Sequence, residues 1–117
     1  MPNTNRPTIS THVLDTTRGE PAAGVEVSVW RLAHKQEISQ GTRETDKDGR
    51  IADAVDGLLA AGTYRMTFDV GAYYKKKGSA PSFMQRFTLD FEITDARRSY
   101  HIPLLMSPYS CSTYRGS

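Results

Sequence analysis

Apolar and polar residues alternate one by one along three segments, and this alternation constrains the fold more than any other feature. It covers residues 25–30, 64–70 and 87–93, where every second side chain is large and apolar. A period of two is typical of half-buried strands in an antiparallel sheet, because successive side chains point to opposite faces. Residues 9–14 and 100–106 predict two further strands of the same kind.

Short turns separate these predicted strands. Clusters of glycine, proline and aspartate at 18–21, 46–49, 61–62 and 94–95 have the composition of turns. Many short strands in 117 residues indicate an all-β domain with two antiparallel sheets packed as a sandwich. We expect one domain over residues 1–117, with 1–7 flexible. Two segments have helical character, 53–60 and 71–77.

Composition and charge narrow the classes of partner. A net charge of +2 and a pI near 8.8 favour small anions, but fall short of a nucleic-acid-binding surface. No apolar run approaches the roughly 20 residues that a membrane span needs, so we expect neither nucleic acid nor membrane as a partner. The single cysteine rules out an internal disulfide framework. Without an apolar signal segment we expect a cytoplasmic protein, although export of a longer precursor stays open.

The alternation also predicts where two of the three histidines point. In the first predicted strand His12 shares a face with Leu14, and in the last His101 shares a face with Leu105. If the more apolar opposite faces form the core, both histidines point outward. Outward leucines need a cover, and a second subunit is the simplest one. We therefore expect the histidines to line a groove between subunits, unless a one-residue bulge reverses the register.

The residue types on these strands favour acid–base chemistry over metal or covalent chemistry. The histidines lack the paired spacing of a metal site, and we expect no metal or other cofactor. Cys111 has no supporting nucleophile signature, so a spectator thiol is the favoured interpretation. His12 and His101 can pass a proton to or from water near neutral pH. Arg50, which follows the 46–49 turn, offers a fixed fork of donors that can hold a carbonyl or oxyanion. Such a set suits hydrolysis of an activated cyclic amide.

The C-terminal residues have side chains suited to a polar pocket rather than the composition of a flexible tail. A polar, aromatic stretch, 107–113, leads to Tyr114, Arg115, Gly116 and Ser117. Hydroxyl and aromatic side chains are commonly half-buried. We expect the terminal serine, the arginine and the tyrosine to lie beside a binding site.

At this point the motifs resemble those of the transthyretin-like 5-hydroxyisourate hydrolases over nearly the whole chain. The opening ISTHVLD at 9–15, GEPAAGV at 19–25 and TDKDGR at 45–50 resemble the family's first three motifs. GTYR at 62–65 and FDVGAYY at 68–74 add specificity. The ending, HIPLL at 101–105, SPYS at 107–110 and the final YRGS, marks the hydrolases and is lost in hormone-carrying transthyretins. Cys111, where an aromatic is common, and the loosely matching 81–86 are departures.

The resemblance implies a transthyretin-like (prealbumin-like) sandwich with one short helix, assembled as a homotetramer with active sites between dimers. It implies hydrolysis of 5-hydroxyisourate, the product of urate oxidation, to 2-oxo-4-hydroxy-4-carboxy-5-ureidoimidazoline on the route to allantoin. The family's catalytic set falls on His12, Arg50, His101 and Ser117. Substrate contacts fall on His12, Arg50 and Tyr114, and no cofactor is implied.

Two other classes of function stay open. One is a transthyretin-type carrier that binds a small ligand in a channel between subunits. The intact set of His12, Arg50 and His101 argues against it, because a passive carrier has no use for a proton relay. The other is a non-catalytic β-sandwich interaction module, which the turn motifs alone would permit.

Overall fold

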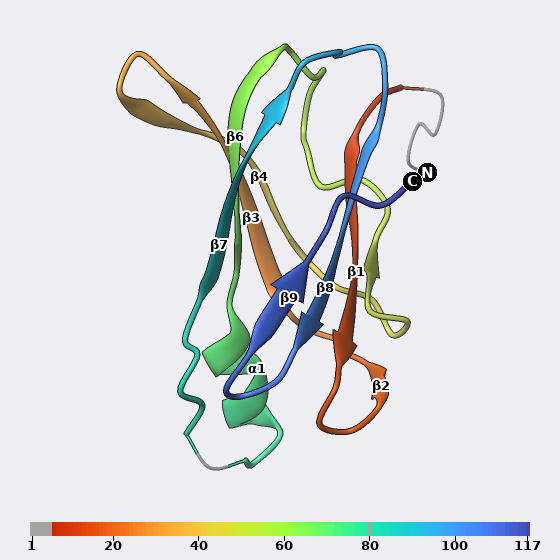
Figure 1. The fold of residues 1–117 in the computed structure, drawn as a ribbon, viewed down its shortest axis with the longest axis vertical. Coiled ribbons are helices and arrows are strands. Elements are labelled where there is room, and N and C mark those ends of the chain that lie inside the picture. Colours follow the sequence, from red (N-terminus) through yellow and green to blue (C-terminus); the bar gives the residue numbers. More distant parts are fainter. Residues whose placement is uncertain (1–5, 80) are drawn as a thin grey trace.

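The computed structural model describes residues 6–79 and 81–117, which fold into two layers of strands and one short helix (Figure 1). This confirms the predicted two-sheet β-sandwich. The described elements, in chain order, are β1 (Ile9–Asp15), β2 (Glu20–Pro21), β3 (Glu26–Ala33), β4 (Gln36–Glu44), β5 (Arg50–Ile51), β6 (Gly62–Phe68), α1 (Val70–Lys76), β7 (Phe87–Ile93), β8 (Tyr100–Met106) and β9 (Cys111–Thr113).

The strands form two sheets, here named sheet A and sheet B. Sheet A has the order β2-β1-β8-β9, with β5 also paired to β1, and sheet B has the order β4-β3-β6-β7. All pairs are antiparallel except β1 with β8, which run parallel over their full length. Sequence analysis did not predict this parallel pair, and it determines which residues of the two strands lie side by side.

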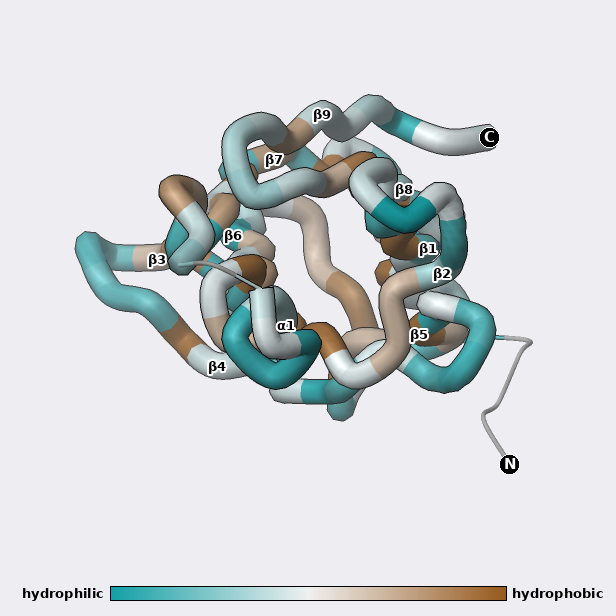
Figure 2. Tube along the Cα trace, turned by 90° about the horizontal axis from the view of Figure 1, so that it is seen from below, coloured by the Kyte–Doolittle hydropathy of each residue, from teal (hydrophilic) through white to brown (hydrophobic). Residues whose placement is uncertain are grey.

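The core lies between the sheets, which stand on either side of it, with α1 at one end (Figure 2). Strand β1 contributes Ile9 and Val13, which are fully buried, and β6 contributes Tyr64, Met66 and Phe68. The alternate residues of both strands are less buried, as the period of two predicts. Burial of these large apolar side chains is the main favourable contribution to folding.

Helix α1 is fixed to the end of sheet A by a buried carboxylate. The N-cap residue Asp69 accepts a hydrogen bond from the Ala72 amide at 3.1 Å. The hydroxyls of Tyr73 and Tyr74 donate to the buried Asp15 carboxylate at 2.9 and 2.8 Å. Burial, followed by the hydrogen bond to Asp15, raises the pKa of both tyrosines. Both phenols therefore stay protonated and act as donors.

The helix expected over 53–60 was a wrong prediction, since this segment is irregular. Its backbone amides bond to strands instead of to one another. The Ala54 amide donates to the Ile9 carbonyl at 2.8 Å, and the Asp56 amide donates to the Gln40 carbonyl at 2.7 Å. These tertiary hydrogen bonds outweigh the weak helical preference of a short segment. The second expected helix is confirmed as α1.

Strand β4 was missed because its sequence carries no apolar alternation. It lies at the edge of sheet B, and most of its residues are exposed. An edge strand with a solvated face needs few apolar residues. A bulge at Val29/Trp30 in the pairing of β3 with β4 further blurs any period of two.

Sequence analysis predicted that residues 1–7 are flexible, and residues 1–5 of this segment lie outside the part of the chain that the structure describes. Arg6 is described, and its guanidinium pairs with Asp53 and with the Gly57 and Val55 carbonyls. The segment before β1 is therefore anchored from Arg6 onward. In the described ranges, 6–79 and 81–117, no helix has the length and apolar character to cross a membrane.

Candidate functional site

The outer face of sheet A brings together two histidines, an arginine and a serine. In the parallel pair Ser10 lies opposite His101, and in the antiparallel pair His12 lies opposite Arg50. Partners opposite one another in a sheet point to the same side. We call Ser10, His12, Arg50 and His101 the histidine face.

The predicted outward direction of both histidines is confirmed. The buried residues of β1 alternate with the position of His12, and in β8 the residues on either side of His101 are buried, while both histidines are half-buried. Pro103, which shares the face of His101, is the one buried residue on that face of β8. The pairing of β1 with β8 contains no bulge. The two histidines are offset by two residues along the strand direction, roughly 7 Å, and by one strand across the sheet, roughly 5 Å. This spacing leaves both imidazoles within reach of one small molecule.

A tight turn delivers Arg50 to this face. The Asp46 carboxylate accepts from the amides of Asp48 and Arg50, both at 2.9 Å. Gly49 has φ +75° and lies so close to β1 that an added Cβ would be 2.5 Å from the Val13 carbonyl oxygen, so only glycine fits there. The Arg50 amide, followed by the Asp48 amide and the positive charges of Arg50 and His12, lowers the pKa of Asp46. The Asp46 carboxylate in this turn therefore stays ionised beside the side chains of Arg50 and His12.

His101 is tuned towards its neutral form. Partial burial is the main cause of its lowered pKa, and the positive charges of His12 and Arg50 lower it further. Its Nδ1 lies 2.9 Å from the Ser10 hydroxyl oxygen. A neutral imidazole has one nitrogen able to accept a proton, so His101 is suited to act as a base near neutral pH.

The C-terminal tail folds back over His101. After β9 it crosses β8 towards β1 (Figure 1), and Gly116 forms a bridge with His101 in which the Gly116 amide donates to the His101 carbonyl at 2.7 Å. Before the crossing, the Thr113 hydroxyl donates to the Pro103 carbonyl at 2.6 Å, and Arg115 stacks 5.3 Å above the Tyr100 ring. Ser117 follows Gly116 and is exposed. The tail therefore ends beside one member of the histidine face.

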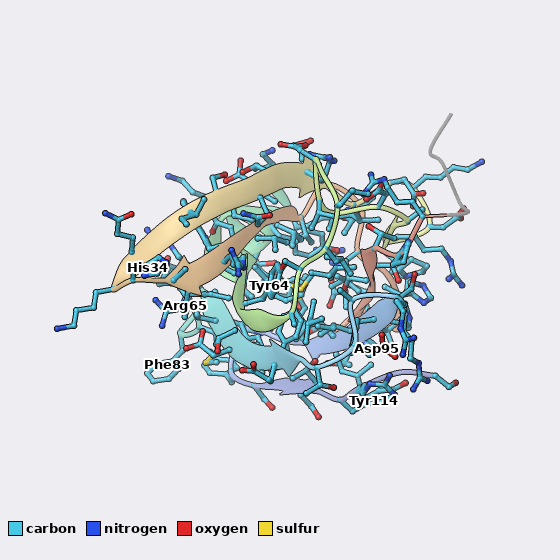
Figure 3. The ribbon with its side chains drawn as sticks, turned by 90° about the horizontal axis from the view of Figure 1, so that it is seen from above. His34, Tyr64, Arg65, Phe83, Asp95 and Tyr114 are labelled. Atoms are coloured by element: carbon cyan, nitrogen blue, oxygen red, sulfur yellow. The ribbon has the colours of Figure 1, made fainter. Side chains whose placement is uncertain are left out.

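Tyr114 lies on a different surface from the histidine face. It is 61% exposed and projects from the outer edge of the molecule (Figure 3). It borders an apolar cavity of about 260 Å³ between β7 and β8–β9. No hydrogen bond of Tyr114 to the histidine face occurs among the residues that the structure describes. The cavity is lined by Leu89, Phe91, Glu92, Tyr100, Ile102, Thr113, Tyr114 and Arg115.

The remaining candidates lie apart from this site. His34 is exposed at the tip of the β3–β4 hairpin, on the other sheet (Figure 3). Cys111 packs against the core, and burial raises the pKa of its thiol, which suppresses the reactive thiolate. Over 6–79 and 81–117, no three His, Cys, Asp or Glu side chains are grouped as metal ligands would be.

Sequence analysis did not single out two residues of this site, Ser10 in the histidine face and Asp46 in the turn beside it. Ser10 precedes His12 by two residues and so shares its face, which the alternation does show. Its contact with His101 depends on the parallel register, which no local pattern encodes. Asp46 was assigned to the turn, and its hydrogen bond to the Arg50 amide is typical of the Asx motif of such turns.

Comparison with known proteins identifies the relatives of the chain. The model of the HIUase/Transthyretin family matches residues 9–116. A 5-hydroxyisourate hydrolase of Deinococcus radiodurans is 44% identical over 115 residues, covering 95% of this chain and 97% of that protein.

Two solved structures share the fold. The 5-hydroxyisourate hydrolase of Klebsiella pneumoniae has a TM-score of 0.84 and 38% identity, covering 95% of this chain and 99% of the other. Sea bream transthyretin in complex with thyroxine has a TM-score of 0.85 and 29% identity, covering 92% and 93%. The resemblance drawn from the motifs is confirmed, and the chain belongs to the HIUase/Transthyretin family.

Proposed function

We propose that this protein hydrolyses 5-hydroxyisourate to 2-oxo-4-hydroxy-4-carboxy-5-ureidoimidazoline in the degradation of urate to allantoin. The observation that carries the proposal is the histidine face, where His12, Arg50 and His101 from three strands share one surface. The relative from D. radiodurans, which is 44% identical and nearly equal in length, bears the same activity in its name.

The residues support a hydrolysis without a covalent intermediate. Water attacks the carbonyl carbon of the cyclic amide, the carbon–nitrogen bond breaks, and the proton lost by water reaches the leaving nitrogen. His12 acts as the general base or relays this proton, and His101 orients the water or passes the proton onward. Arg50 holds the substrate oxygen on which negative charge develops. No cofactor takes part.

The tail completes the site in this proposal. Ser117 is exposed directly after Gly116, which bridges to His101, so its hydroxyl can bond to substrate. Tyr114 is proposed as a further substrate contact. Its position on the cavity between β7 and β8–β9 requires that its side chain turn, or that a neighbouring subunit bring the substrate to it.

We also propose that the protein is a homotetramer. Leu14 is half-buried and Leu105 is 39% exposed on the outer face of sheet A, and apolar side chains around a polar site favour a covering subunit. A second copy over this face would exclude water from the histidines and strengthen their interactions with substrate. Sedimentation equilibrium would give the mass, and a monomer at working concentrations would contradict this assembly.

The activity is tested by generating 5-hydroxyisourate with urate oxidase and following its ultraviolet decay. Catalytic amounts of the protein should accelerate a decay that also occurs spontaneously. An unchanged decay rate would reject the proposal. Tight binding of a thyroid-hormone-like ligand without turnover would favour the carrier function, which the shared fold with transthyretin leaves structurally possible.

A further inference from the structure

His101 is held on two sides by groups that the reaction does not consume. On one side its Nδ1 lies 2.9 Å from the Ser10 hydroxyl oxygen. On the other, the tail backbone is so close that a Cβ added at Gly116 would lie 2.6 Å from His101 Cδ2 and 3.3 Å from Cγ. An imidazole held at Nδ1 and beside Cδ2 keeps one orientation, which is what a proton-transfer group needs.

The contact with Ser10 also decides which nitrogen is free. With Nδ1 occupied by Ser10, Nε2 is the nitrogen left for a substrate or water. Of the two other basic groups of the face, Arg50 can only donate hydrogen bonds. Beside a group that only donates, a lone pair on Nε2 of His101 is therefore more favourable than an N–H on Nε2. That arrangement places the proton on Nδ1, where the Ser10 oxygen accepts it.

We propose that Ser10 is a positioning residue for hydrolysis, which accepts a hydrogen bond from His101 Nδ1–H and so keeps the lone pair on Nε2. Its catalytic consequence rests on the proposed function, whereas the tautomer is a property of the folded protein alone. Ser10 is suited to this role because the parallel register sets it directly opposite His101, and because its short side chain ends in a hydroxyl that can accept.

Nitrogen NMR of protein labelled with ¹⁵N-histidine tests the tautomer. At a pH of about 8, above the ordinary histidine pKa, His101 of the wild-type protein should show a protonated Nδ1 and a bare Nε2. Ser10→Ala should give a mixture of tautomers, and Ser10→Thr, which keeps the hydroxyl and suits a strand, should restore the wild-type pattern. The opposite tautomer in the wild-type protein would overturn the proposal whatever the activity.

Kinetics test the consequence for catalysis. Ser10→Ala should lower kcat about 3- to 10-fold, the equivalent of one hydrogen bond, with little change in KM, and Ser10→Thr should recover it. A matched control is Ser28→Ala, which removes another half-buried strand hydroxyl, bonded to Thr42 at 3.2 Å on sheet B, and should leave kcat and the His101 tautomer unchanged.

The outcomes separate the two proposals. If Ser10→Ala lowers the thermal stability but leaves the tautomer and kcat as in the wild type, Ser10 is only structural and the inference fails. If the predicted tautomer is seen but the wild-type protein does not hydrolyse 5-hydroxyisourate, the proposed function fails, and the catalytic role of Ser10 fails with it.

Discussion

The outer faces of the two sheets use polar residues in opposite ways. On sheet B the polar side chains satisfy one another across the strands. Arg65 binds both carboxylate oxygens of Asp90, at 2.7 and 2.9 Å, and also Glu37 at 2.6 Å, and Thr63 donates to Glu92 at 2.7 Å. Such cross-strand pairs stabilise a solvated sheet face.

On sheet A the basic side chains of the histidine face have no ionic partners of this kind in the described part of the chain. None of the ion pairs among residues 6–79 and 81–117 involves His12, Arg50 or His101. The carboxylate of Asp46, whose pKa is lowered by the Arg50 amide and also by the charges of Arg50 and His12, bonds to backbone amides instead. The difference indicates that sheet B uses its charges for the fold, whereas the histidine face of sheet A keeps its donors and acceptors available for a ligand.

Removing a histidine from sheet A should have the largest effect on activity. His12→Ala or His101→Asn should lower kcat/KM by about 10² to 10⁴, the usual contribution of a general acid or base. Initial rates, corrected for spontaneous decay of 5-hydroxyisourate, measure this. A variant as fast as the wild type would remove that histidine from the proposed mechanism, and circular dichroism would show whether the sandwich is still folded.

The tail should matter next, because it touches the histidine face without belonging to the core. Gly116→Ala places a Cβ against the His101 ring, so we expect a loss of roughly 10-fold or more in kcat, since small displacements of a catalytic group are costly. The melting temperature should change little, because residue 116 follows the last strand. A large stability loss with normal kcat would show that the tail serves the fold instead.

Much of this contrast follows from the sequence, and the remainder depends on long-range register. The period of two in β1 and β8 predicts that His12 and His101 point outward, since alternation is a local property. Ser10 and His101 are 91 residues apart in the chain, and only the pairing of β1 with β8 brings them into contact. The prediction of a helix over 53–60 failed for the same reason, because amides of this segment donate hydrogen bonds to β1 and β4.

The third test is the pH dependence of activity at the histidine face. Burial and the charges of His12 and Arg50 lower the pKa of His101, so its neutral form persists below the ordinary histidine value of about 6.5. The acid limb of kcat/KM should therefore fall below pH 6.5. An acid limb above that value would show that a group other than His101 sets it.

The same shift has a consequence for folding. The unfolded chain takes up the proton of His101 at a higher pH than the folded one, so the contribution of His101 to stability is present above about pH 6.5 and is lost as the pH falls towards the folded pKa. Urea titrations from pH 8 to pH 5 measure this loss, and His101→Asn should reduce it. An equal slope in the two proteins would mean that other groups cause it.

The smallest effect should come from breaking the polar network of sheet B. Arg65→Ala removes the partner of Asp90 and Glu37 but leaves the histidine face intact, so kcat should be unchanged. The melting temperature should drop slightly, and less at high salt, because exposed ion pairs are weak and screened. Loss of activity without loss of stability would mean that the face of sheet B binds a ligand or subunit after all. Since Arg65 holds two carboxylates at once, Arg65→Lys, which cannot form the bidentate pair, should fall between Arg65→Ala and the wild type in stability.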